Sequence, residues 1–134
     1  MGEVHVRVRL SNAWDLEQLR RGVATADQVR SCEVEALVDT GSTRSVLPSE
    51  VVERLGLTLI DSAVGKLADG TNASVDIACP VGFEIMGRRT VEEAYVMGSE
   101  ILIGQTTLEA TDLLVDCKEQ RVIGKHSEGP IFRL

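Results

Sequence analysis

The chain has 134 residues, of which 43% are hydrophobic and 26% charged, and its formal net charge is -7. We expect one globular domain over residues 1–134, because this length can bury a core of its own. Nucleic acids and anionic membranes bind basic surfaces, so neither is an expected partner of this acidic chain. The pairs Arg20–Arg21 and Arg88–Arg89 are interpreted as solvated faces. No apolar run approaches the ~20 residues of a membrane-spanning helix.

The cysteines and histidines do not form a recognisable site. Cys32, Cys79 and Cys117 are odd in number, widely spaced and without a C-x-x-C pair, so we expect neither a disulfide framework nor a zinc site. His5 and His126 have no metal-binding residue at ligand spacing and are interpreted as surface residues. We therefore expect no metal and no cofactor. With no signal peptide evident at the N-terminus, the expected location is cytoplasmic.

The first third of the chain predicts two strands around a short helix. Apolar and polar residues alternate over residues 4–10, as in a half-buried strand. A helix is expected to follow Ser11–Asn12 and to end by Gly22, with Trp14 in the core or lining a groove. Residues 29–39 form a second predicted strand, which becomes fully apolar toward its end, as in a strand that moves to the centre of a sheet.

The middle of the chain predicts a helix and a tight turn. Residues 46–48 read as extended chain, because the residue before a proline avoids helical backbone angles. Ser49 is expected to cap a helix that ends at Gly56. Asp69–Gly70 lies between two strand-like segments, and this dipeptide is a strong hairpin signal.

The last part of the chain predicts further short strands. Residues 101–103 are wholly apolar and end at Gly104, after which a short helix is expected over residues 106–110. The other predicted strands cover residues 75–85, 90–97, 113–117 and 121–123.

The stretch LVDTGS over residues 37–42 raises the question of function. Leu37 and Val38 read as the end of a buried strand, whereas Asp39 is charged and costly to bury without partners. Three features follow one another along the chain: this strand ending in Asp-Thr-Gly-Ser, the Asp69–Gly70 hairpin, and the apolar strand ending in Gly104. In this combination the chain resembles the retropepsin-like aspartic proteases, most closely the small bacterial members.

The resemblance implies an all-β fold: a closed acid-protease barrel with one or two short helices, active as a twofold homodimer on a polypeptide substrate. Peptide hydrolysis by water needs one carboxylate to take a proton and one carboxylic acid to donate a proton. Two adjacent carboxyls achieve this by sharing a proton. The chain has one Asp-Thr-Gly, so the resemblance implies that each of two subunits supplies one Asp39 to the site.

The resemblance also assigns roles to the residues around Asp39. Gly41 lets the backbone approach the carboxylates, and the Thr40 hydroxyl crosses to the partner chain. Ser42 is expected to reach the carboxylate or the substrate. Gly104 occupies a position that must lack a side chain.

The flap over the substrate would be the hairpin around Asp69–Gly70. Leu67 and Ala68 are expected to line the substrate pockets together with Val46.

Two departures from the retroviral pattern and three alternative interpretations remain. The C-terminal tail has a Gly129–Pro130 break before the short segment Ile131–Phe132, which leaves open whether it joins a sheet between subunits. Where retroviral enzymes carry an acid and an arginine as an ion pair near the dimer interface, this chain has Thr43–Arg44 and Gln105. Asp39 could be an ordinary turn residue in an unrelated β domain. Asp69–Gly70–Thr71 could be the motif of a haloacid-dehalogenase-like phosphatase, but the aspartate expected two positions earlier is missing. The chain could also be a non-catalytic dimerisation or peptide-binding module of the same fold.

Overall fold

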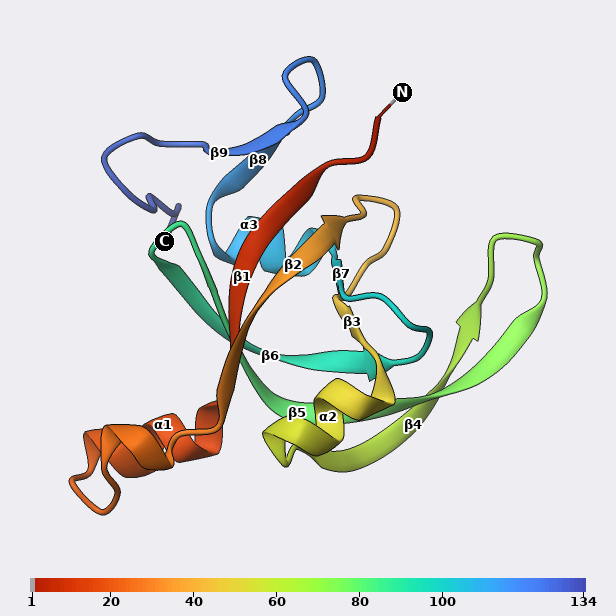
Figure 1. The fold of residues 1–134 in the computed structure, drawn as a ribbon. Helices are drawn as coiled ribbons and strands as arrows, with labels where there is room; N and C mark the ends of the chain where they lie inside the picture. The colour runs from red at the N-terminus through yellow and green to blue at the C-terminus, as the bar shows by residue number, and fades with distance from the viewer. Residues whose placement is uncertain (1) are drawn as a thin grey trace.

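The computed structural model describes residues 2–134 and consists mainly of β-strands (Figure 1). The strands are β1 (His5–Asn12), β2 (Ser31–Val38), β3 (Val46–Leu47), β4 (Thr58–Lys66), β5 (Asn72–Ile85), β6 (Arg88–Val96), β7 (Leu102–Ile103), β8 (Leu113–Asp116) and β9 (Arg121–Gly124). The helices are α1 (Ala13–Arg20), α2 (Ser49–Leu55) and α3 (Gln105–Ala110), with a 3-10 turn over Ala26–Gln28. The all-β class is confirmed, with three short α-helices in the described chain, where the resemblance implied one or two and the sequence pattern predicted three.

The main sheet closes on itself. Its strand order is β1-β2-β7-β3-β6-β5-β4, and β1 also pairs with β5, for example Leu10 opposite Phe83. This second pairing joins the two ends of the β1-to-β5 series into a ring. β4 lies outside the ring and pairs with the first half of β5, so that β4 and β5 project from the barrel as a long hairpin (Figure 1). β8 and β9 form a separate antiparallel pair.

The core lies inside this ring. Its largest side chains are less than 2% exposed and come from β1, β3, β5, β7 and helix α2; they are Leu10, Leu47, Leu55, Phe83, Ile85 and Ile103. Burial of such side chains stabilises the fold by about 1.5–3 kcal/mol each. Ile103 places β7, which leads to Gly104, in this interior, and the buried Ala36 does the same for β2, which leads to Asp39.

The helix ends follow from local chemistry, with two differences from expectation. The Asn12 side chain accepts hydrogen bonds from the amides of Trp14 and Asp15, at 2.9 and 3.2 Å, and so caps α1. Trp14 is 61% exposed, so the predicted core or groove position is wrong. The N-cap of α2 is Pro48, and Ser49 is the first helical residue. α2 ends as predicted at Gly56, with φ of +63°.

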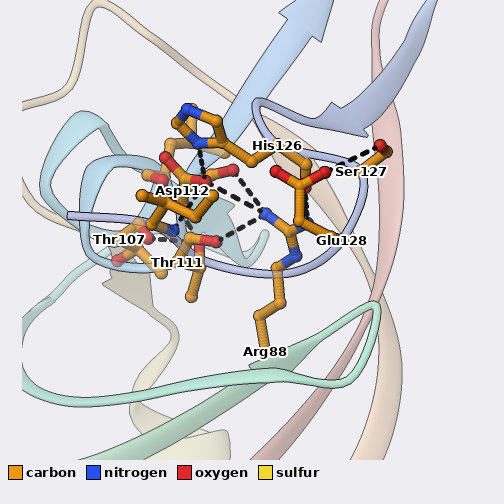
Figure 2. Close-up of polar contacts among 9 residues, drawn as sticks. Arg88, Thr107, Thr111, Asp112, His126, Ser127 and Glu128 are labelled. Carbon is orange, nitrogen blue, oxygen red and sulfur yellow. Dashed lines mark hydrogen bonds and ion pairs between the residues drawn. The ribbon is translucent and has the colours of Figure 1, made fainter.

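A buried polar cluster lies beside the end of α3, and Figure 2 shows it with Arg88 pointing up from β6. Arg88 is 8% exposed and donates to the carbonyls of Thr111, Asp112 and His126. His126 Nδ1 lies 2.7 Å from the buried Asp112 carboxylate, whose Oδ2 can only accept when ionised. The solvated-face interpretation of Arg88 is therefore wrong, and His126 is half-buried and paired.

The cluster also holds part of the C-terminal tail, because the Ile131 amide donates to Asp112 Oδ2 at 3.3 Å. Residues 125–134 contain no strand. No helix within residues 2–134 combines the length and apolar character needed to cross a membrane.

Candidate active site

Asp39 stands where two parallel strands end side by side. β2 pairs with β7 in parallel, with Val38 opposite Ile103, and the Asp39 amide donates to the Ile103 carbonyl at 2.9 Å. Asp39 and Gly104 consequently leave the sheet at the same edge. The Asp39 side chain is half-buried there, at the mouth of the barrel rather than inside its core.

The turn after Asp39 folds back on the carboxylate. The Gly41 amide donates to Asp39 Oδ1 at 3.0 Å, and the Ser42 amide donates to the Asp39 carbonyl at 3.1 Å. A Cβ on Gly41 would lie 3.2 Å from Asp39 Oδ1, tighter than an ordinary contact. The glycine therefore keeps space beside the oxygen that its own amide stabilises.

Ser42 is placed differently from its expected role. Its hydroxyl donates to the Arg44 carbonyl at 2.6 Å, so its proton stays within the loop. The Ser42 oxygen keeps a lone pair that can accept a hydrogen bond. Thr40 lies at the tip of the turn, where its side chain is open to solvent.

The start of helix α3 holds the loop after Asp39 through backbone hydrogen bonds. The Gln105 amide donates to the Ser42 carbonyl at 2.8 Å, and the Thr106 amide donates to the Thr43 carbonyl at 3.0 Å. Gly104 lies directly beneath: a Cβ there would lie 2.4 Å from the Arg44 oxygen and 2.9 Å from the Ser42 oxygen. Both neighbours are backbone atoms, so this position tolerates no side chain in the observed arrangement.

Arg44 provides an ion pair close to where the retroviral-type pair is missing. Its Nη1 lies 3.0 Å from Glu93 Oε1, and its guanidinium carbon lies 5.9 Å from the centre of the Tyr95 ring. This brace runs within the chain, from the loop to β6. Sequence reasoning missed Glu93, because it lies 49 positions from Arg44 and no local motif marks it. Tyr95 was expected in the core or lining a groove, and it lines the groove in front of Asp39.

A groove of about 650 Å³ opens in front of Asp39 and runs to the β4–β5 hairpin. Its lining includes Asp39, Gly41 and Ser42 from the Asp39 turn, and Leu67 and Ala68 from the β4–β5 hairpin. The remaining lining residues are mostly apolar: Thr43, Val46, Val64, Gly65, Lys66, Val75, Tyr95 and Met97. The structure therefore brings five predicted site residues and Val46 to one surface. The other four, Thr40, Asp69, Gly70 and Gly104, do not line this groove.

The hairpin tip forms a tight, self-contained turn. The Leu67 amide donates to Thr71 O at 2.8 Å, and the Gly70 amide donates to Leu67 O at 2.9 Å. Hydrogen bonds from the Thr71 hydroxyl and amide to Asp69 lower the pKa of the Asp69 carboxyl. Gly70 has φ of +87°, and a Cβ at this position would meet no atom within 4 Å, so the backbone angle alone favours glycine there.

Among the described residues, Asp39 and Lys66 are the only carboxylate and the only amine on the groove lining. Within residues 2–134, no group of three metal-binding side chains comes together. The groove thus offers one carboxylate beside an apolar channel.

The comparison with protein families matched residues 24–124 to the family described as "Aspartyl protease". The match covers about three quarters of the chain and contains the Asp39 turn, the β4–β5 hairpin and Gly104. A search of curated proteins found no match.

Proposed function

We propose that this chain, which belongs to the aspartyl protease family, is an endopeptidase in which water activated by two Asp39 carboxyls hydrolyses a peptide bond. The observation that carries the proposal is the placement of Asp39. It sits at the end of β2, receives a hydrogen bond from the Gly41 amide, and lines a groove of about 650 Å³. The β4–β5 hairpin would act as the flap, with Gly70 at its tip.

The second carboxyl is proposed to come from another copy of the chain. The chemistry requires a proton acceptor and a proton donor at the same water. Within residues 2–134, Asp39 is the single carboxylate on the groove lining, so no second one from the same chain is in place. A twofold pairing of two Asp39 turns would bring two carboxyls together and let them share one proton. The exposed Thr40 at the tip of the turn is then free to contact the partner loop.

The groove supports a polypeptide substrate with apolar side chains. Val46, Leu67 and Val75 line the groove, whereas Lys66 is the sole basic residue of the described chain on it. An extended peptide would place alternate side chains against this apolar wall. Substrate-binding roles are accordingly proposed for Ser42, Leu67 and Ala68 on the lining. Asp69, Gly70 and Gly104 would act by shaping the flap and the floor.

The direct test is cleavage of a diverse peptide library by the wild-type protein and by Asp39→Asn. We expect the wild type to cleave at acidic to mildly acidic pH, with a rate that falls once both carboxyls are ionised. Asp39→Asn should be inactive with an unchanged melting temperature, because the amide preserves size. Asp27→Asn, an exposed aspartate away from the groove, is the matched control and should be fully active. Peptide binding without cleavage by the wild type would instead favour a non-catalytic peptide-binding module.

A further inference from the structure

A chain of buried hydroxyls runs behind the Asp39 turn. Ser45 and Thr107 are both 0% exposed, and their side-chain oxygens lie 2.6 Å apart. The Thr107 hydroxyl also lies 2.7 Å from Glu92 Oε1 on β6. At the other end, the Gly104 amide donates to Ser45 Oγ at 3.0 Å. Four groups from three segments are thus linked: Glu92 on β6, Ser45 directly before β3, and Thr107 in α3 together with Gly104, the N-cap of that helix.

The Glu92 carboxylate at one end of this hydrogen-bond series sets the direction of each hydrogen bond. An ionised Glu92 carboxylate can only accept, so the Thr107 hydroxyl donates its one proton to Glu92. Thr107 can then only accept from Ser45, which therefore donates to it. This leaves the Ser45 oxygen with its lone pairs available for the Gly104 amide. Glu92 at one end thus sets the orientation of both hydroxyls and presents an acceptor to Gly104.

Gly104 connects this hydrogen-bond series to the loop that follows Asp39. The next two amides, of Gln105 and Thr106, donate to the carbonyls of Ser42 and Thr43. The residue before Gly104, Ile103, accepts from the Asp39 amide. Any shift of Gly104 therefore moves backbone that contacts the Asp39 turn on both sides.

We propose that Glu92 is a positioning residue for catalysis, acting through the Thr107 and Ser45 hydroxyls on Gly104 and hence on the loop that carries Asp39. The inference rests on the proposed protease function for its catalytic consequence. Glu92 also accepts from the Thr90 hydroxyl at 3.2 Å, which holds the carboxylate in place from its own strand. Buried hydrogen-bonded hydroxyls of this kind fix one arrangement, because an unpaired donor in the interior is unfavourable.

Thr107 has a matched control in Thr111. Both threonines are 0% exposed and lie in or directly after α3, so Thr107→Val and Thr111→Val each remove one buried hydroxyl. The Thr111 hydroxyl donates only to the helix carbonyls of Thr107 and Leu108 and does not join the chain to Gly104. If the Thr107 hydroxyl had a purely structural role, Thr107→Val and Thr111→Val would have equal effects on Gly104 exchange and on peptide cleavage.

The first measurement is hydrogen exchange of the Gly104 amide by NMR. We expect Thr107→Val to accelerate this exchange about tenfold and Thr111→Val to leave it unchanged. Thr107→Ser, which keeps the hydroxyl, should restore wild-type exchange. Glu92→Gln retains a carbonyl acceptor and should behave like the wild type, whereas Glu92→Ala should match Thr107→Val. Glu92→Ala also tests the proposal should Thr107→Val fail to fold.

The second measurement is peptide cleavage by the same variants. Thr107→Val and Glu92→Ala should lower kcat about tenfold with little change in KM, because a displaced loop misplaces the reacting carboxyl rather than the substrate pockets. Unchanged Gly104 exchange in both variants, or an equal effect of Thr111→Val, would overturn the proposal. A wild-type protein without any cleavage activity would instead refute the protease function, and the exchange experiment would still test the link from Glu92 to Gly104.

Discussion

Gly104→Ala isolates the contact between Gly104 and the loop that follows Asp39. The backbone of Gly104 has φ of -92° and ψ of 179°, extended angles that alanine adopts without strain. The substitution therefore acts through the added methyl group alone. That group would lie 2.4 Å from the oxygen and 2.5 Å from the carbonyl carbon of Arg44.

The size of the effect follows from these distances. An ordinary contact of a Cβ begins near 3.4 Å, so the loop would have to retreat by about 1 Å (3.4 − 2.4). Overpacking of this kind destabilises a protein by about 1–3 kcal/mol. A displacement of about 1 Å at a catalytic group lowers the rate by roughly 100-fold. Since Asp39 belongs to the loop that must move, we expect both effects in Gly104→Ala.

Gly82→Ala is the matched control, because Gly82 is also buried but a Cβ there would be 3.4 Å from Leu16 Cδ1, an ordinary contact. Urea unfolding and steady-state cleavage of one peptide substrate would be measured for both variants. We expect Gly82→Ala to stay within about 1 kcal/mol of the wild type with normal kcat/KM. Wild-type stability and turnover in Gly104→Ala would refute the argument that this position supports the catalytic loop.

Three further predictions concern the proposed flap, the Arg44–Glu93 ion pair and the C-terminal cluster. Gly70→Val should lower turnover far more than melting temperature, because φ of +87° is unfavourable for valine at an open flap tip; small, equal changes would make this turn an ordinary surface loop. Arg44→Met should lower kcat/KM, because the loop after Asp39 would no longer be held to Glu93. Normal kinetics would show that this ion pair does not hold the loop in place. Burial raises the pKa of the Asp112 carboxyl, but hydrogen bonds from His126 and the Ile131 amide outweigh this and lower the pKa overall, with help from the charges of His126 and Arg88. The ionised Asp112 therefore contributes stability above its unfolded pKa of about 4, and this is lost as the pH falls through the folded value. The stability difference between the wild type and Asp112→Asn in urea should accordingly be present at neutral pH and shrink as the pH falls below about 4, and a constant difference would contradict the assignment.

The parts of the fold that could be predicted from sequence were those with a local cause. The strand before Asp39, the hairpin at Asp69–Gly70 and the apolar strand before Gly104 each carry their signal in adjacent residues. Their order along the chain carries the resemblance to the retropepsin-like aspartic proteases, and it was this resemblance that implied the closed β-fold.

Other features depend on contacts between distant positions, and the sequence does not mark these. Arg88 and Arg89 look alike in sequence, but strand alternation turns Arg88 inward and leaves Arg89 exposed. The groups that bind Arg88 lie 23 to 38 residues further on, so nothing local identifies it as buried. The same holds for Glu92, whose link to Ser45 passes through a helix residue that reads as an ordinary threonine.

The central claim, that one active site takes Asp39 from each of two chains, is tested most directly by mixing subunits. Wild-type protein is mixed with excess Asp39→Asn protein, exchange is verified by mass, and peptide cleavage is measured. With a wild-type fraction f, active dimers scale as f², so activity per wild-type chain should fall in proportion to f, to roughly a tenth when one chain in ten is wild type. Asp27→Asn chains in the same excess provide the control. They keep Asp39, so the activity per chain that carries Asp39 should not fall. Constant activity per wild-type chain after proven exchange with Asp39→Asn would contradict a site shared between two chains.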